Sequence, residues 1–106
     1  MAEEPDRGAL LASIRPWSVG INAAGYPVSA TFPGPRRFEI YEHGLFVRAL
    51  SVLEFIERAD ILAIVRVPLG VRVHWELGAG EGIAFISSPR RGRIIRELEA
   101  AHYVVA

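Results

Sequence analysis

The sequence predicts a mainly β fold of the α+β kind, built from seven antiparallel strands and closed by one C-terminal helix. Apolar and polar residues alternate in short runs from residue 28 to residue 87, and this period of two is the pattern of half-buried strands. The segments between the runs are too short for the crossovers that parallel strands need. A helical spacing of apolar residues follows residue 89.

The chain has 106 residues, which is the size of one compact domain. We expect residues 9–106 to form this domain and residues 1–8, which contain no apolar periodicity, to be a disordered start. No cysteine is present, so disulfides, thiolate metal sites and thiol catalysis are excluded.

The charges of the chain balance, with 12 acidic and 12 basic side chains, and every basic residue is an arginine. A net charge of zero argues against a nucleic-acid coat protein, which needs a cationic surplus. The arginines reflect either the coding bias of a GC-rich genome or a surface selected for bidentate contacts with anions. The longest apolar run, residues 61–65, is too short to span a bilayer, and the acidic N-terminus differs from a secretory signal. We therefore expect a cytoplasmic protein.

The first third of the chain carries the weakest signals. Residues 9–14 are a short apolar segment that fits a helix or a strand equally well, and prolines and glycines interrupt residues 15–37. Residues 28–32 alternate and are predicted to be a strand. The alternation of Trp17, Val19 and Ile21 allows a further strand before it.

The remaining strands are predicted with sharper boundaries. A hairpin with its turn at Glu42, His43 and Gly44 is followed by a third strand, a continuous β-branched run and a second hairpin around the glycine-rich residues 78–82. The six predicted strands are residues 37–42, 45–50, 53–57, 61–67, 71–77 and 82–87.

The predicted helix starts at Ser87, Ser88 and Pro89, with a serine that accepts from free backbone donors and the proline at the first helical position. It ends at His102 and Tyr103. The apolar side chains that fall within an arc of about 120° and would face the sheet are Ile94, Ile95, Leu98 and Ala101.

The order of elements and the segments FEIYEHGLFVR (38–48), FIERADI (55–61) and RGRIIREL (91–98) resemble the bacterial pleckstrin-homology-like (PH-like) domains, over residues 28–103. The resemblance implies a bent barrel or sandwich of a four-stranded and a three-stranded sheet, closed by the terminal helix. It also implies non-enzymatic roles in protein contacts and oligomer formation, with lipid headgroup binding among the eukaryotic relatives. Where those relatives have a basic loop, this chain has residues 33–37 with two arginines.

Five arginines are candidates for contacts with an anion or a partner: Arg36, Arg37, Arg90, Arg91 and Arg93. The last three lie in the first turn of the predicted helix, where they oppose the positive end of the helix dipole. An anion or an acidic partner surface would offset this repulsion. The alternative is neutralisation by carboxylates of this domain or a neighbouring subunit, such as Glu57, Asp60 or Glu81.

Some predicted strands are apolar on both faces, and Phe46, Leu50 and Ile86 are candidate interface residues. The helix covers one face. The other face is covered either by the N-terminal segment with its aromatic residues Trp17, Tyr26 and Phe32, or by another chain. The second alternative predicts a homo-oligomer or a complex with another protein.

We expect no catalytic residues, metal site or cofactor. The histidines at positions 43, 74 and 102 lack the spacing of metal ligands, and His74 is expected on the polar face of a strand in a cross-strand pair. Residues 78–82 precede a strand, whereas a phosphate loop precedes a helix. Glu54 and Glu57 would point to opposite faces of their strand.

These patterns favour a non-catalytic interaction or assembly module. The alternatives are peripheral attachment to an anionic membrane, or binding of a phosphate ligand, through the arginines. A small enzyme or accessory subunit with a pocket between the sheets is a third hypothesis.

Overall fold

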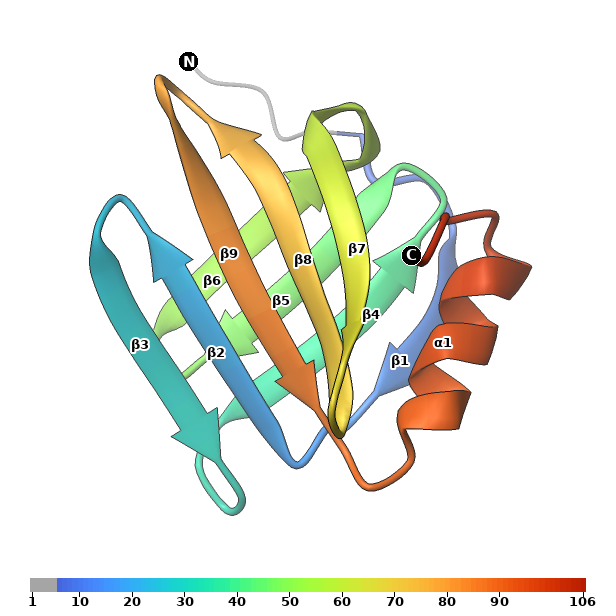
Figure 1. Ribbon diagram of the computed structural model, residues 1–106, viewed down its shortest axis with the longest axis horizontal. Helices are drawn as coiled ribbons and strands as arrows, with labels where there is room; N and C mark the ends of the chain where they lie inside the picture. The colour runs from blue at the N-terminus through green and yellow to red at the C-terminus, as the bar shows by residue number, and fades with distance from the viewer. Residues whose placement is uncertain (1–5) are drawn as a thin grey trace.

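The computed structural model describes residues 6–106, which form nine strands, one 3-10 turn and one helix (Figure 1). The elements are β1 (Leu10–Ile14), β2 (Ser18–Ala23), β3 (Tyr26–Thr31), β4 (Arg36–Tyr41), β5 (Gly44–Ala49), β6 (Val52–Glu57), η1 (Arg58–Asp60), β7 (Ile61–Val67), β8 (Gly70–Leu77), β9 (Gly80–Ser87) and α1 (Arg91–Ala100).

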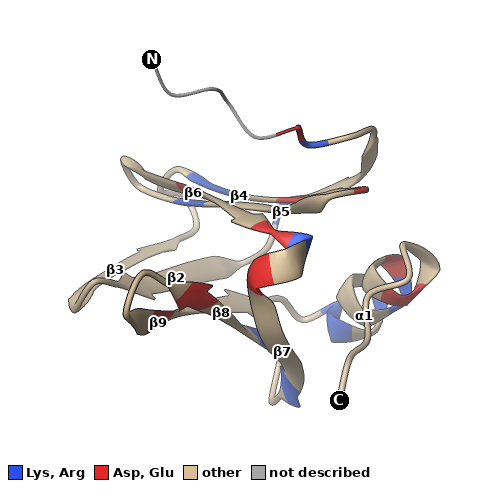
Figure 2. Ribbon diagram, turned by 90° about the horizontal axis from the view of Figure 1, so that it is seen from above, with Lys and Arg blue, Asp and Glu red and all other residues tan. Residues whose placement is uncertain are grey.

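Two antiparallel sheets lie one above the other (Figure 2). One has the strand order β1-β4-β5-β6 and the other the order β3-β2-β9-β8-β7. Each contains a run of three strands consecutive in sequence, β4 to β6 and β7 to β9. These match the six strands predicted between residues 37 and 87 to within two residues. The prediction of a mainly β, antiparallel fold with one C-terminal helix is confirmed.

The predicted number of seven strands is wrong, because residues 6–106 contain nine. Residues 9–14, for which the sequence fitted a helix or a strand equally well, contain β1, which pairs with β4. The further strand that the alternation around Val19 allowed is β2, which pairs with β3 and β9. The predicted strand at residues 28–32 is β3 and joins the larger sheet, so the sheets have four and five strands. They are separate sheets and form no closed barrel.

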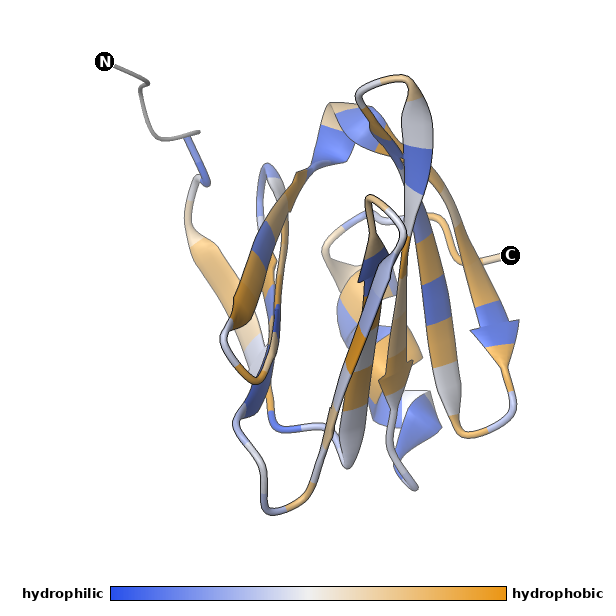
Figure 3. Cartoon of the chain, turned by 90° about the vertical axis from the view of Figure 1, so that its left-hand side faces the viewer, coloured by the Kyte–Doolittle hydropathy of each residue, from blue (hydrophilic) through white to orange (hydrophobic). Residues whose placement is uncertain are grey.

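The core lies between the sheets. Apolar and polar residues alternate along the strands (Figure 3), so each strand turns one set of side chains inward. Phe38 and Ile40 of β4 face the core beside Leu45 and Val47 of β5, and all four are fully buried. The opposing sheet contributes Val19, Ile21, Val71, Val73, Trp75, Ala84 and Ile86.

Helix α1 lies at one side of the sandwich, next to β1 and β7 (Figure 1). It begins at Arg91, two residues after the predicted proline start, with Arg90 as its N-cap. His102 adopts a left-handed conformation with φ of 65° just after the helix, where such a residue typically ends a helical segment. The predicted apolar face is confirmed, because the structure buries Ile94, Ile95, Leu98 and Ala101.

Arg58 and Tyr103 connect the C-terminal end of α1 to the strands through hydrogen bonds and a cation–π contact. The Arg58 Nη2 donates to the Ala101 carbonyl at 2.6 Å, and its guanidinium lies 3.7 Å from the centre of the Tyr103 ring. The Tyr103 hydroxyl donates to the Tyr41 carbonyl at 2.7 Å. Burial raises the pKa of Tyr103, although the Arg58 charge acts in the opposite direction.

Candidate functional site

Four chain connections meet at one end of the sandwich, which we call the arginine end: residues 15–17, 32–35, 68–69 and 88–90. Backbone hydrogen bonds join them. The Trp17 amide donates to the Ser87 carbonyl at 2.8 Å, the Phe32 amide to the Trp17 carbonyl at 3.0 Å, and the Ser88 amide to the Leu69 carbonyl at 2.6 Å. Side chains from distant parts of the sequence are therefore held together here.

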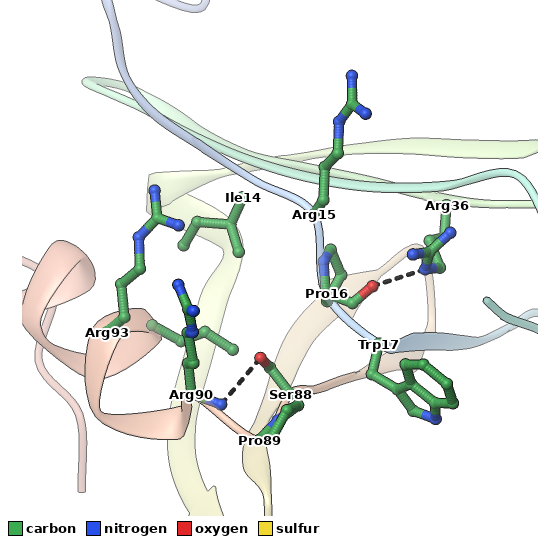
Figure 4. A pocket seen from close by; sticks show the side chains of 10 residues that line it. Ile14, Arg15, Pro16, Trp17, Arg36, Ser88, Pro89, Arg90 and Arg93 are labelled. Carbon is green, nitrogen blue, oxygen red and sulfur yellow. Dashed lines mark hydrogen bonds between the residues drawn. The ribbon is translucent and has the colours of Figure 1, made fainter. Parts of the chain in front are cut away.

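A cleft of about 240 Å³ opens at the arginine end and is lined by Arg15, Arg36, Arg90 and Arg93 (Figure 4). Arg15 comes from the connection between β1 and β2, Arg36 from the start of β4, and the other two from the beginning of α1. The rest of the lining is Ile14, Pro16, Trp17, Ser88, Pro89 and Ile94.

A second cleft, of about 420 Å³, shares Arg15 and Arg36 with the first. Arg37 and Arg48 also line it, together with one carboxylate, Glu39. The two clefts make a continuous cationic surface around Arg15 and Arg36. Arg15 was not among the candidates from the sequence, because its position depends on how β1 and β2 divide between the sheets.

Within residues 6–106, no arginine has a carboxylate within 4.0 Å, and the ion pairs there are His43 with Asp6 and His74 with Glu81. The predicted alternative, neutralisation by Glu57, Asp60 or Glu81 of the same domain, is therefore not realised in this part of the chain. Glu81 pairs with His74 across the β8–β9 hairpin instead, which confirms the expected cross-strand pair of His74.

The candidate arginines differ in the hydrogen bonds that their side chains make within the chain. Arg36 is half-buried and donates from Nε to the Pro16 carbonyl at 2.6 Å and from Nη1 to the Gly34 carbonyl at 3.0 Å. Arg91 does not line the cleft, and its Nη1 donates to the Val67 carbonyl at 3.2 Å. Among the described residues, Arg90 and Arg93 have no side-chain partner and are exposed at the first cleft.

The start of α1 adds a second source of positive potential. Its first turn contains no acidic residue, and Arg90 makes no side-chain cap. The Ser88 hydroxyl accepts from the Arg90 amide at 3.1 Å, as predicted for a serine before the helix. Backbone donors and the dipole at a helix start favour negative charge, so an anion in the first cleft would be stabilised by both the helix and the guanidinium groups.

Large apolar side chains are exposed beside these arginines. Trp17, Phe32 and Leu69 are 52%, 56% and 66% exposed. The Trp17 and Phe32 rings stack with centres 5.5 Å apart, and the Arg36 guanidinium lies 5.1 Å from the centre of the Phe32 ring. Trp17 and Leu69 line a further cleft of about 260 Å³. The arginine end thus combines cations with an apolar surface.

The three candidate interface residues do not line the first or the second cleft, and two of them offer little surface. Ile86 is fully buried in the core because the inward face of β9 carries Ala84 and Ile86, which leaves Phe85 on the outside. Phe46 is 7% exposed, whereas Leu50, in the turn after β5, is 44% exposed. The aromatic residues expected to cover a sheet face do not do so, since Trp17, Tyr26 and Phe32 are exposed.

The glycine-rich residues 78–82 and the histidines form no phosphate or metal site in the part of the chain that the structure describes. Residues 78–79 are a two-residue turn between β8 and β9, shorter than the predicted five-residue loop. In residues 6–106 no three acidic or histidine side chains gather as metal ligands. The only helix there is too short and too polar to cross a bilayer.

Glu54 is a half-buried carboxyl group on the inward face of β6, directly opposite Val47, whereas Glu57 lies on the outward face. Burial raises the pKa of Glu54 above its ordinary value of 4.5, because the charged form loses hydration. A raised pKa means that the folded state binds the proton more tightly, so this group lowers stability as the pH rises above 4.5.

We therefore expect Glu54→Gln to become more stabilising, relative to the unchanged chain, as the pH increases from 4 to 7. Urea unfolding of both proteins at several pH values measures this difference. Glu57→Gln is the matched control and should show no such trend. A difference between Glu54→Gln and the unchanged chain that is constant with pH would contradict the assignment.

Comparison of the chain with protein-family models, with curated proteins and with solved structures finds no match. A function therefore has to be argued from the chemistry of the clefts and surfaces themselves. Among the described residues, the arginine end brings Arg15, Arg36, Arg90 and Arg93 together in one cleft.

Proposed function

We propose that this chain is a non-catalytic, PH-like interaction module that binds an acidic surface of a protein partner through its arginine end. The observation that carries the proposal is the first cleft, where Arg15, Arg90 and Arg93 meet without a carboxylate within 4.0 Å among residues 6–106. Like charges that share a cleft repel one another. A carboxylate or phosphate placed between them would replace this repulsion with charge-assisted hydrogen bonds.

The apolar rim supports a macromolecular partner. Tryptophan and arginine dominate the residues that contribute most to protein interfaces, and exposed apolar side chains gain free energy when a partner covers them. Trp17, Phe32 and Leu69 stand beside the arginines at this end. A second copy of the chain is one such partner, and this contact would make the protein a homo-oligomer in the cytoplasm.

Attachment to an anionic membrane is the second candidate. The same three exposed residues favour it, because tryptophan and other apolar side chains enter the interfacial layer while neighbouring arginines contact acidic headgroups. The helix start would then face the lipid surface. This candidate shares the arginine end with the first and differs in what covers Trp17, Phe32 and Leu69.

The test compares two double variants with equal changes in charge. Arg90→Glu with Arg93→Glu removes both exposed helix arginines of the first cleft, whereas Arg91→Glu with Arg96→Glu alters residues of the same helix that do not line it. Binding of a polyglutamate peptide, followed by fluorescence of the exposed Trp17, should weaken at least tenfold (about 1.4 kcal/mol) in the first variant. It should change much less in the control variant.

Vesicle sedimentation and light scattering separate the candidates. Binding to phosphatidylserine vesicles, lost on removal of the anionic lipid, would favour the membrane. Association in light scattering that disappears in the Arg90→Glu, Arg93→Glu variant would favour self-assembly. If the unchanged chain binds neither polyglutamate nor acidic vesicles at low salt and stays monomeric, the proposed function is wrong.

A further inference from the structure

The outer face of the four-stranded sheet carries an aromatic cage formed by Tyr41, Phe46 and Phe55. The guanidinium of Arg7 lies between the three rings, at 5.7 Å from the centre of the Tyr41 ring, 5.2 Å from that of Phe46 and 5.0 Å from that of Phe55. These distances are within the range for attraction between a cation and an aromatic ring. The side chain of Arg7, which was expected in a disordered start at residues 1–8, thus has a defined position against the three rings.

The sheet register builds this cage. Phe46 and Phe55 are directly opposite each other on β5 and β6, and the Tyr41 and Phe55 rings meet edge to face with centres 6.0 Å apart. Gly44 provides the space for Phe55, because a Cβ atom at Gly44 would lie 2.6 Å from the Phe55 Cζ. The ring occupies the place that a side chain at position 44 would fill.

A carboxylate borders the cage. Glu39 is directly opposite Phe46 on the same face of the sheet, and its Oε1 accepts a hydrogen bond from the Tyr41 hydroxyl at 3.2 Å. The negative charge beside the rings adds to the attraction for a cation. The arrangement therefore combines the two features that recognise weakly hydrated cations, aromatic faces and a nearby anion.

Arg7 is held at the cage mainly through its backbone. The His43 amide donates to the Arg7 carbonyl at 3.0 Å, and the Glu42 amide donates to the Ala9 carbonyl at 3.0 Å. Within residues 6–106 the Arg7 guanidinium makes no hydrogen bond or ion pair, so the rings are its contacts. A second guanidinium could take its place without breaking a hydrogen bond of the side chain.

We propose that the cage of Tyr41, Phe46 and Phe55 is a recognition site for an arginine side chain of a partner protein, and that Arg7 is its built-in competitor. The fit of Arg7 defines the ligand as a guanidinium group. The site lies on the outer sheet face, and Glu39, which borders it, also lines the second cleft. A partner peptide that supplies an arginine would displace Arg7 and leave the backbone contacts of residues 7–9 in place.

The experiment uses N-acetyl-arginine amide as the probe and N-acetyl-citrulline amide, its uncharged counterpart, as the control. Saturable shifts of the Tyr41, Phe46 and Phe55 ring resonances measure binding by NMR. We expect Arg7→Ala to bind the arginine probe and the unchanged chain to bind it more weakly. A tethered competitor at millimolar effective concentration weakens binding in proportion to the ratio of that concentration to the Kd of the probe. Arg7→Gln, which keeps most of the side-chain length, should behave like Arg7→Ala.

The cage itself is tested by adding Phe55→Leu to either Arg7 variant, which should abolish binding of the arginine probe. Tetramethylammonium tests whether the cage also accepts a cation that cannot donate hydrogen bonds. The inference is overturned if neither folded Arg7 variant binds the arginine probe. It is also overturned if the citrulline probe binds equally well, since the cage would then be an apolar surface without preference for charge.

Discussion

Replacement of Phe38 with alanine is expected to lower the free energy of unfolding by about 3–5 kcal/mol. Phe38 is fully buried on β4, between Ile14 of β1 and Val47 of β5. Removal of its ring loses the transfer free energy of the side chain and leaves a cavity that the paired strands cannot close. Since domains of this size are stable by only about 5–15 kcal/mol, the loss is a large part of the total.

Urea unfolding followed by circular dichroism measures this effect. Leu53→Ala is the matched control, because Leu53 lies on the outer face of the same sheet and is exposed. The control should change stability far less than Phe38→Ala does. A loss below about 1 kcal/mol for Phe38→Ala would mean that the face of β4 is assigned wrongly.

Replacement of Gly82 with alanine is expected to cost about 1–3 kcal/mol, although it adds a single methyl group. Gly82 is directly opposite Trp75, whose ring lies across the glycine. A Cβ atom there would lie 2.8 Å from the Trp75 Cη2 and collide with two further ring atoms. The buried tryptophan ring, the facing strand or both would have to shift.

Gly20→Ala in the neighbouring strand is the matched control. Its Cβ would meet nothing closer than 3.8 Å, so the change should stay within about 0.5 kcal/mol. Thermal unfolding and tryptophan fluorescence measure both variants, and only Gly82→Ala should also shift the Trp75 emission. Equal stabilities for the two variants would contradict the proposed packing of Trp75 on Gly82.

The strands from β4 to β9 could be predicted because their apolar patterns are local and their partners are close in sequence. β1 and β2 could not be placed in the same way. Ile14 pairs with Phe38 of β4 and Val19 pairs with Ile86 of β9, so each strand has a partner far along the chain, although β2 also forms a hairpin with its neighbour β3. A register shift between Leu10 and Ala12 also interrupts the alternation of β1.

The site was predictable only in part, for a similar reason. The sequence indicated Arg90 and Arg93 through their position at the helix start, and Arg36 through its loop. It could not indicate Arg15, which reaches the cleft only because the chain changes sheets next to it. The aromatic cage requires the register of three strands, and Phe46, expected at an interface, proved to be covered by Arg7 of its own chain.

The passage of residues 15–17 from one sheet to the other has a mechanical consequence. The three-strand runs β4 to β6 and β7 to β9 consist of neighbours in sequence and need only short loops to close. By contrast, β1 pairs with the more distant β4, and β2 joins its neighbour β3 to the distant β9. The connection between β1 and β2 ties the two layers together, as do the connections from β3 to β4 and from β6 to β7. Within residues 6–106 the chain thus passes between the layers three times, so neither sheet can slide far over the other without pulling on the paired strands next to these passages.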